Sequence, residues 1–291
     1  MGRRAKVKDR SFRVRGDGRR GVLLLHGLTG APGEMKALGR VLHRQGFGLY
    51  APLLAGHGGT EADLLKTGWR DWVASARAAY LDYAREVDEV YVAGICAGGA
   101  IGLALCAEFP QIRGAAVYSM LFEYDGWNMP PITMGARVIQ IVANLPLIRR
   151  LSFTQPHPYG LKDVRLRDLA ARALQSMIPG ALDRMPLGAM HQLYRLARHV
   201  EQVAPQVTAP VLIVHAREDD MANPRNAYRL RDALGGPNEV VLLEDSYHMV
   251  HVDKEHVHVG ELTARLFGAT APVAPTTPAT ASVAPREAID A

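Results

Sequence analysis

A cysteine at a short glycine-bounded turn is the residue best placed for nucleophilic chemistry. The segment Gly94 to Gly98 (GICAG) follows an apolar run of strand length, Val87 to Ile95, and precedes a helix-like run, Ala100 to Glu108. A nucleophile held on a strand-to-helix turn needs small residues two positions before and after it, because neighbouring backbone passes within contact distance. At a helix N-terminus the dipole and free amides also favour thiolate over thiol. We therefore predict that Cys96 is a nucleophile; the alternative is a small apolar core residue in a glycine-rich turn.

A histidine and an aspartate that follow later strand-like runs could serve that thiol. The run Pro210 to His215 ends in a loop that carries Asp219 and Asp220, and the run Glu239 to Leu243 leads to a loop with His248. The carboxyl ends of strands in an α/β sheet form the edge where ligands bind. His248 would take the thiol proton and return it to the leaving group, and Asp219 would orient the imidazole. Asp220 is the alternative acid, and a solvated acidic loop is the alternative without function.

Three further histidines and a second cysteine lie near these candidates. The spacing of His251, His256 and His258 after His248 matches no zinc-binding pattern, so we predict no metal site. Cys106 lies on the apolar side of the expected helix and is interpreted as a core residue. Because both cysteines belong to one strand-turn-helix, no disulfide framework is indicated, and a reducing compartment is expected.

The elements that would position these residues alternate between strand and helix. Gly21 to Leu25 (GVLLL) has the continuous apolar character of a buried strand and ends in the glycine-bounded loop His26 to Gly30. Further runs of the two kinds follow: helix Gly33 to Arg44, strand Phe47 to Leu53, helix Trp72 to Glu86 and strand Gly114 to Met120. This order implies right-handed crossovers. We predict an α/β fold, with a mostly parallel central sheet flanked by helices.

Composition divides the chain into three parts. Nine of the first twenty residues are basic, so residues 1–20 are predicted to be a basic arm, and the Ala/Pro/Thr-rich residues 269–291 a disordered tail. Between them, residues 21–268 are predicted to form one domain. Its interval 121–206 has no convincing strand and contains prolines among short helical stretches, which indicates a mostly helical cap.

Charge and hydropathy limit the partners. The net charge is +5 and the pI about 9.3, with much of the surplus in the basic arm. That arm is interpreted as solvated; the alternative is attraction to an anionic partner such as an acyl carrier protein, coenzyme A phosphates or a membrane surface. No nucleic-acid-binding pattern accompanies it. No apolar run approaches ~20 residues and no signal-peptide pattern is present, so no integral membrane segment is predicted and a cytoplasmic location is expected.

Taken together, these segments resemble the bacterial carboxylesterase and monoacylglycerol-lipase branch of the α/β-hydrolase superfamily, from about Gly21 to Phe267. The matching segments are LLLHGLTG (Leu23 to Gly30), the turn Gly56 to Gly58, TGWRDW (Thr67 to Trp72), the GICAG turn, HAREDDMANP (His215 to Pro224) and DSYHMVHVDKE (Asp245 to Glu255). The resemblance implies an α/β-hydrolase fold with a cap over an acyl pocket, hydrolysis of short to long acyl esters without a cofactor, and a triad in which Asp219 and His248 take part. The chain departs from the family pattern at Cys96, where the family has serine.

The resemblance also implies which groups hold the substrate. Hydrolases of this fold stabilise the oxyanion with the amide after the nucleophile and with one from the loop after an early strand. Here these are the backbone N–H groups of Ala97 and Leu28. Four neighbours of these groups are expected to contact the substrate: His26, Gly27, Ile95 and Met249.

A thiol nucleophile changes the chemistry expected of such a site. Acyl-Cys96 would be a thioester, nearly equal in free energy to a coenzyme A or carrier-protein thioester. Three functions follow: hydrolysis of carboxylic esters or thioesters, acyl transfer from such a thioester to a small acceptor under a cap that excludes water, and hydrolase-like binding without turnover. Apolar residues of the cap, which include Met129, Ile132 and Leu145, predict a preference for medium or long acyl chains over acetyl.

Overall fold

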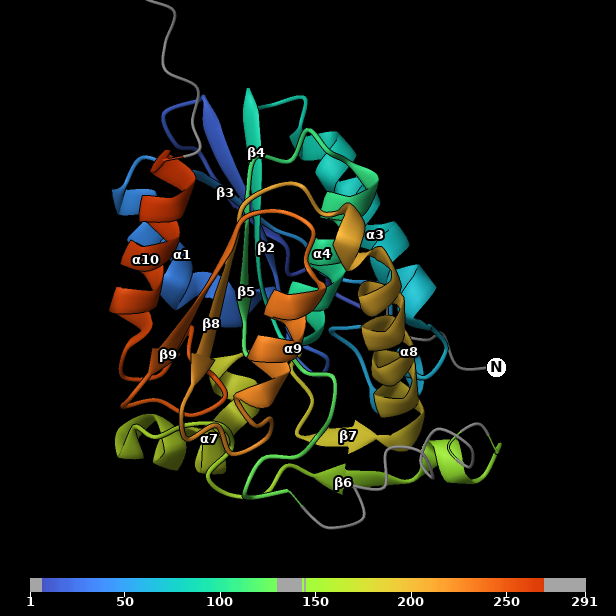
Figure 1. The fold of residues 1–291 in the computed structure, drawn as a ribbon. Coiled ribbons are helices and arrows are strands. Elements are labelled where there is room, and N and C mark those ends of the chain that lie inside the picture. Colours follow the sequence, from blue (N-terminus) through green and yellow to red (C-terminus); the bar gives the residue numbers. More distant parts are fainter. Residues whose placement is uncertain (1–6, 130–142, 144, 270–291) are drawn as a thin grey trace, which may run out of the picture.

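A seven-stranded sheet runs through the middle of the protein, with helices on both of its faces (Figure 1). The computed structural model describes residues 7–129, 143 and 145–269, so the predicted tail lies outside it from residue 270 onward. The strands are β1 (Phe12–Val14), β2 (Arg20–Leu25), β3 (Gly48–Ala51), β4 (Glu89–Ile95), β5 (Ala115–Tyr118), β8 (Val211–Ala216) and β9 (Asn238–Leu243). They are arranged in the order β1-β3-β2-β4-β5-β8-β9, and all pairs are parallel except β1 with β3. The mostly parallel sheet is the one that the sequence predicts.

The central strands are apolar along their whole length because helices cover both of their faces. Val22 to Leu25 of β2 are fully buried, and every residue of β4 is buried. The two strands pair in parallel, so that Leu25 lies opposite Gly94. From β2 the chain passes to β3 on one side and to β4 on the other, which makes the carboxyl ends of β2 and β4 the switch point where α/β sheets bind ligands.

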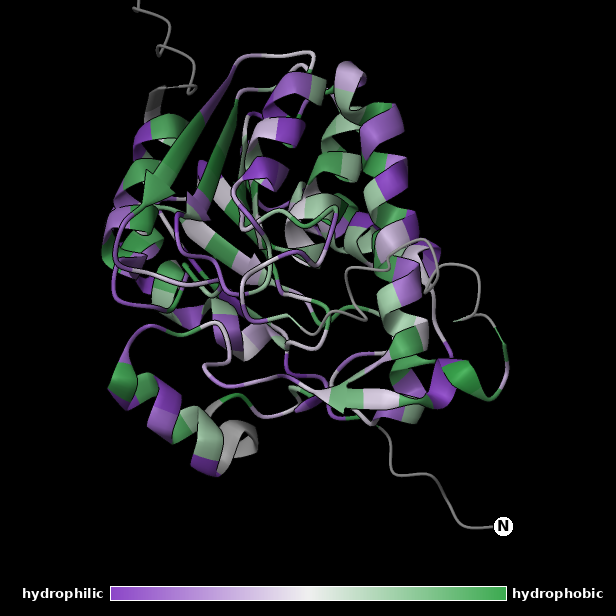
Figure 2. Ribbon diagram, turned by 60° about the horizontal axis from the view of Figure 1, so that its bottom comes forward, coloured by the Kyte–Doolittle hydropathy of each residue, from purple (hydrophilic) through white to green (hydrophobic). Residues whose placement is uncertain are grey.

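Helices pack in a layer on each side of the sheet. α1 (Lys36–Arg44) packs against α10 (His256–Ala269), while α3 (Trp69–Tyr83), α4 (Ala97–Glu108) and α8 (Leu187–Val203) pack against one another. The other helices of the described chain are η1 (Pro32–Met35), α2 (Glu61–Leu64), η2 (Ile148–Arg150), α7 (Val164–Met177), η3 (Ala204–Gln206) and α9 (Arg225–Ala233). Figure 2 shows mainly hydrophobic strands between helices that carry both hydrophilic and hydrophobic residues, as expected for amphipathic helices that cover a sheet.

Only part of residues 121–206, the interval predicted to be a cap, lies away from the sheet. α8 belongs to the layer beside the sheet, because Met190, Leu193 and Leu196 on one of its faces are buried against the core. The segment that leaves the sheet after β5, which we call the excursion, therefore ends near residue 186. It contains an unpredicted antiparallel ribbon of β6 (Ser152–Thr154) and β7 (Arg184–Pro186), whose three-residue strands are too short to give an alternating pattern in the sequence.

Part of the predicted basic arm joins the sheet. β1 pairs with β3, and Arg13 of β1 forms ion pairs with Asp82 and Glu86 at the end of α3. Arg20 already belongs to β2. In the part of the chain that the structure describes, no helix combines the length and apolar character needed to cross a membrane.

Candidate active site

Cys96 lies on a strained turn between β4 and α4. Its backbone has φ 50° and ψ −110°, a positive φ that residues with a side chain rarely adopt. A Cβ atom on Gly94 would lie 2.4 Å from the carbonyl carbon of Gly98, and one on Gly98 would lie 2.1 Å from the carbonyl oxygen of Leu25. Neither position can hold a side chain, which is the physical reason for the glycine spacing around the cysteine.

The side chains of Cys96, His248 and Asp219 meet at the carboxyl edge of the sheet. Nδ1 of His248 lies 2.9 Å from Oδ2 and 3.1 Å from Oδ1 of Asp219. The thiol of Cys96 lies close enough to the imidazole of His248 to raise its pKa. Burial alone would lower the pKa of His248, but the charge and hydrogen bond of Asp219, with a smaller effect of Cys96, raise this pKa well above its usual value. The three residues thus have the contacts of a nucleophile, a base and an orienting acid.

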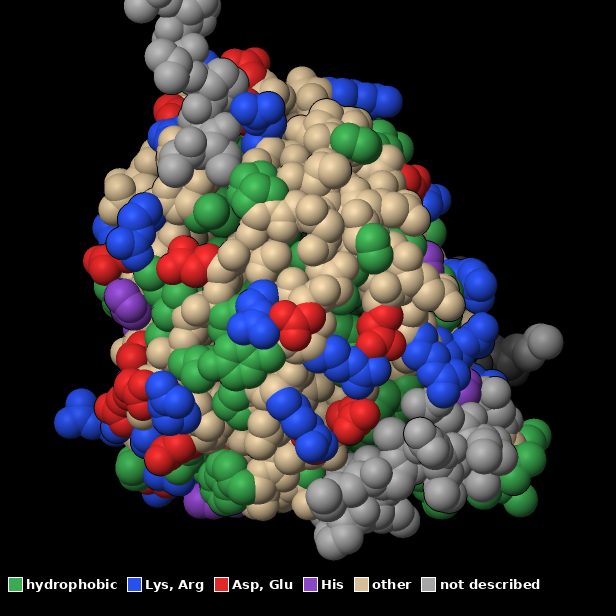
Figure 3. Space-filling view, viewed as in Figure 1, with side chains coloured by type: hydrophobic (Ala, Val, Ile, Leu, Met, Phe, Trp, Pro, Cys, Tyr) green, Lys and Arg blue, Asp and Glu red, His purple; other side chains and the backbone are tan. Residues whose placement is uncertain are grey.

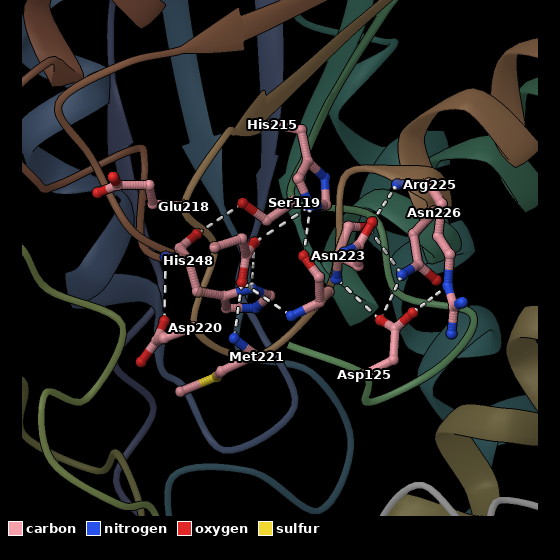
Figure 4. Close-up of polar contacts among 12 residues, drawn as sticks. Ser119, Asp125, His215, Glu218, Asp220, Met221, Asn223, Arg225, Asn226 and His248 are labelled. Atoms are coloured by element: carbon pink, nitrogen blue, oxygen red, sulfur yellow. Dashed lines mark hydrogen bonds and ion pairs between the residues drawn. The ribbon is translucent and has the colours of Figure 1, made fainter. Parts of the chain in front are cut away.

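The two neighbouring aspartates have separate roles. Oδ1 of Asp219 accepts hydrogen bonds from the backbone amides of Met221 and Ala222, both at 2.8 Å. Burial favours a raised pKa for Asp219, yet His248 lowers it, so this carboxyl is charged. The side chain of Asp220 accepts instead from the backbone amides of Gly160 at 3.0 Å and His248 at 3.4 Å (Figure 4). Burial, followed by the charge of Asp219, raises the pKa of Asp220 to about 6.

The loop that carries the predicted oxyanion amide is held from two sides. The carbonyl oxygen of Leu28 lies 2.8 Å from Nε2 of His57, and the amide of Gly27 donates to Oε1 of Glu34 at 2.5 Å. Within the described residues, the backbone N–H groups of Leu28 and Ala97 have no hydrogen-bond acceptor. These are two free backbone donors, one directly after Cys96 and one in the loop after β2, and an oxyanion hole requires such donors.

Comparison with known proteins identifies the family. The family model described as serine aminopeptidase, S33 (Hydrolase_4) matches residues 16–255. The chain belongs to this family. It is therefore a hydrolase of the α/β-hydrolase fold, and the predicted fold is confirmed.

Similar proteins cover nearly the whole chain of this S33-family hydrolase. A thermostable monoacylglycerol lipase from Bacillus sp. (strain H-257) is 27% identical over 85% of this chain and 90% of its own length. A carboxylesterase from Bacillus subtilis (strain 168) is 24% identical over 86% of this chain and 92% of its own. Among solved structures, a monoacylglycerol lipase from Paleococcus ferrophilus shares the fold with a TM-score of 0.75 and 17% identity, over 91% of this chain and all of that one.

The predicted substrate contacts of the S33-family hydrolase occupy different environments. His26 is fully buried, where Nδ1 lies 3.0 Å from the carbonyl oxygen of Gly27 and Nε2 accepts from the amide of Leu54 at 3.2 Å. Ile95 is 1% exposed. These two residues hold the backbone around the site and present no surface to a substrate, since hydrogen bonds or packing occupy them completely. Gly27 and Met249 are partly exposed, and Met249 lines a cavity.

Four residues that the sequence did not suggest hold the catalytic groups in place. Ser119 at the end of β5 donates from Oγ to the carbonyl oxygen of His248 at 2.6 Å, and Nε2 of His215 in β8 lies 3.3 Å from Oδ2 of Asp219. Asp253 is fully buried and accepts from the amide of Tyr247 at 2.9 Å and from that of Lys162 at 2.8 Å. Tyr124 is the fourth. Burial raises its pKa well above the usual value, Cys96 adds to this shift, and the phenol donates to Sδ of Met185 at 3.3 Å.

A signal in the sequence exists for two of these four. Ser119 and His215 are polar residues at the carboxyl ends of apolar strands, the same rule that found Asp219. Asp253 and Tyr124 follow no strand and had no such signal. Figure 4 also shows Asp125, next to Tyr124, which accepts from the amide of Asn223 at 2.8 Å and so ties the start of the excursion to the Asp219 loop.

The remaining candidates lie away from the reacting groups. Cys106 is buried in α4, and burial raises its thiol pKa to about 12. His251 is fully buried with no hydrogen-bond partner for either ring nitrogen among the described residues, and burial lowers its pKa to about 3. The chain as described holds no group of three His, Cys, Asp or Glu residues that could bind a metal ion. Of the apolar cap residues, Ile132 lies outside the described residues, whereas Met129 is buried and Leu145 exposed.

Proposed function

We propose that this hydrolase cleaves carboxylic esters or thioesters through an acyl-Cys96 intermediate. The single observation that carries the proposal is the chain of contacts from the Cys96 thiol to His248 and from His248 to the buried Asp219. The names of the two bacterial relatives, a monoacylglycerol lipase and a carboxylesterase, favour an ester substrate. The family is named for a serine, and the cysteine on the strained turn is this chain's own departure from that name.

The proposed reaction needs a proton shuttle and two amides. His248 takes the proton of the Cys96 thiol while sulfur attacks the carbonyl carbon, and the N–H groups of Leu28 and Ala97 hold the resulting oxyanion. Collapse of that intermediate breaks the bond to the alcohol or thiol, which leaves with the proton from His248. A water molecule then gives a proton to the same imidazole and attacks the thioester, and the acid departs as Cys96 regains its proton.

Acyl transfer is the second candidate, and the thiol itself favours it. An acyl-Cys96 thioester can exchange acyl groups with coenzyme A or an acyl carrier protein at little cost in free energy, whereas an oxyester must climb to form it. Both cysteines are free thiols, and a nucleophilic thiol has to stay reduced, so a reducing compartment such as the cytoplasm suits either reaction.

Mass spectrometry of the intact protein together with ester turnover tests the proposal. Wild type, Cys96→Ser, Cys96→Ala and the matched control Cys106→Ala are each incubated with matched p-nitrophenyl esters and acyl thioesters. We expect an acyl adduct on Cys96 in wild type and in Cys106→Ala, and neither adduct nor turnover in Cys96→Ala. Turnover by Cys96→Ala at the wild-type rate would refute the proposed nucleophile. An adduct that decays to free acid in water supports hydrolysis, and one that persists until an acceptor is added supports transfer.

A further inference from the structure

We infer that this hydrolase accepts substrates that carry an anionic group, a carboxylate or a phosphate, in a cavity beside the catalytic triad. The inference rests on the proposed function, because it names a substrate class for the same site. The cavity has a volume of about 880 Å³ and lies between α1, α7, β6 and the start of α10. Its size is within the range of small-molecule sites, about 300–1,000 Å³.

The inner wall of the cavity adjoins the reacting groups. Met249 follows His248 directly, and its amide donates to the carbonyl oxygen of Gly160 at 2.8 Å. Glu34, also in the wall, accepts the amide of Gly27, the residue before the predicted oxyanion donor Leu28. The lining is therefore connected to the candidate base through Met249 and to the oxyanion loop through Glu34.

Much of the cavity lining is apolar. Leu161, Leu166, Ile178 and Val252 belong to it together with Met249. Glu34 also lines the cavity, but its carboxyl accepts the Gly27 amide, and burial raises its pKa to about 7. An alkyl chain suits such a lining because its burial there removes apolar surface from water.

Three exposed cations of the cavity lining have no acidic partner among the described residues; Lys36 lies only over the ring of Phe12, 6.0 Å from its centroid. Lys36 and Arg40 lie four residues apart on α1 and so share one helix face, while Arg172 comes from α7. None of the three forms an ion pair within the part of the chain that the structure describes. Elsewhere the surface differs: in the view of Figure 3 many basic side chains lie next to acidic ones. Arg217, for example, pairs with Glu244, and Arg77 with Glu108.

The other charged or titratable groups of the lining do not neutralise these cations. Asp183 is exposed and lies beyond ion-pair distance of all three, and His256 uses Nδ1 near the carbonyl oxygen of Asp253 at 2.8 Å. The lining thus combines apolar side chains with three exposed cations. A guanidinium group offers two parallel donors to a carboxylate or phosphate, and this favours an anionic ligand over a neutral one.

Two pairs of substrates separate the possible sources of the anion. The first pair is a p-nitrophenyl ester with a carboxylate at the far end of the acyl chain and its neutral methyl-ester counterpart of equal length. The second pair is an acyl-coenzyme A and the same acyl group on N-acetylcysteamine, which lacks the phosphates. The measured quantity is the ratio of kcat/KM for the anionic member to kcat/KM for the neutral member.

The variants are Arg40→Gln, Arg172→Gln and their combination. The matched controls are Arg44→Gln on α1 and Arg165→Gln on α7, which replace exposed arginines outside the cavity lining. We expect the ratio to fall about ten-fold in the double variant and to stay unchanged in the controls. Higher ionic strength should lower the wild-type ratio in the same direction. A fall for the first pair assigns the anion to the acyl chain, and a fall for the second assigns it to the leaving group.

An unchanged ratio in the double variant for both pairs would overturn the inference, as would an equal fall in the two controls. Failure of the proposed function has a different signature. In that case the neutral esters are hydrolysed at the same rate by Cys96→Ala. Calorimetric binding of the ω-carboxyl ether analogue, which cannot be hydrolysed, to the protein with and without the Arg40→Gln and Arg172→Gln changes then still tests the cavity, and equal affinity of the two proteins refutes it.

Discussion

Replacement of Glu34 by glutamine should change how the stability of the protein depends on pH. The side chain is 4% exposed and holds the amide of Gly27 in the oxyanion loop. Burial is the largest cause of a pKa raised to about 7, against 4.5 for an ordinary glutamate, although hydrogen bonds from the backbone oppose it. The folded protein therefore keeps this carboxyl protonated in a pH range where the unfolded chain ionises it.

The sign and size follow from these two values. Above the unfolded pKa, ionisation stabilises the unfolded chain, so the stability contribution of a buried acid with a raised pKa falls until the pH reaches the folded pKa. Between about pH 5 and about pH 8 the two values, 4.5 and about 7, give a loss of about 2.5 kcal/mol in the free energy of unfolding. Glu34→Gln has no titratable group at this position and should lack that loss.

Urea unfolding at several pH values provides the measurement. We expect the difference in unfolding free energy between Glu34→Gln and wild type to move in favour of the variant by about 2.5 kcal/mol from about pH 5 to about pH 8. Other titrating groups, such as Asp220, cancel in this difference. Glu261→Gln on the exposed face of α10 is the matched control and should give a curve parallel to that of wild type. Parallel curves for Glu34→Gln as well would refute the reasoning.

Three further predictions concern the catalytic groups. Iodoacetamide should label Cys96 in the folded protein and spare the buried Cys106, whose pKa is raised to about 12. Peptide mass spectrometry measures the labelling, and equal labelling of the two cysteines would contradict the prediction. Asp219→Asn should lower kcat/KM by about 10²–10⁴ and shift the acidic limb of the pH-rate profile to lower pH, because no carboxylate then raises the pKa of His248. An unshifted acidic limb would speak against Asp219 as the partner of the His248 imidazole. Ser119→Ala should lower the free energy of unfolding by ~1–3 kcal/mol and reduce kcat/KM, because it removes the hydroxyl that donates to the carbonyl of His248. If urea unfolding and ester kinetics give wild-type values for this variant, the contact is dispensable.

The fold was predictable because its signals are local. β2 and β4 are continuous apolar runs that end in glycine-bounded turns, and the spacing of Gly94 and Gly98 reports a backbone that leaves no room for a Cβ atom. The position of the nucleophile follows from that turn. The acid was predictable only as one of two neighbours, since adjacent residues of a loop point in different directions and the sequence does not say which one faces the histidine.

The groups that support the site were less predictable because they come from distant parts of the chain. Ser119 and His248 are 129 residues apart, and their contact exists only because β5 lies beside β8 and β8 beside β9 in the sheet. Asp253 holds the amides of Lys162 and Asp163, residues that belong to the excursion. Such contacts depend on how the excursion folds back over the sheet, which hydrophobic periodicity does not encode. The end of the excursion was misplaced for the same reason, because the pattern of α8 gives an apolar face without saying what it covers.

The surroundings of Asp219 direct its charge toward His248. Burial lowers the pKa of His215, which favours a neutral ring. Because the carbonyl of Ala222, 2.8 Å from Nε2, can only accept, Nε2 carries the proton, and it also lies 3.3 Å from Oδ2 of Asp219. Asp220 has a pKa of about 6, so a fall in pH protonates it before the lowered pKa of Asp219 is reached. Acidification therefore first removes a like charge beside Asp219 and leaves the ion pair with His248 intact. The carboxylate that raises the pKa of His248 is thus the last of the two to be lost, and this order would preserve the proposed proton shuttle.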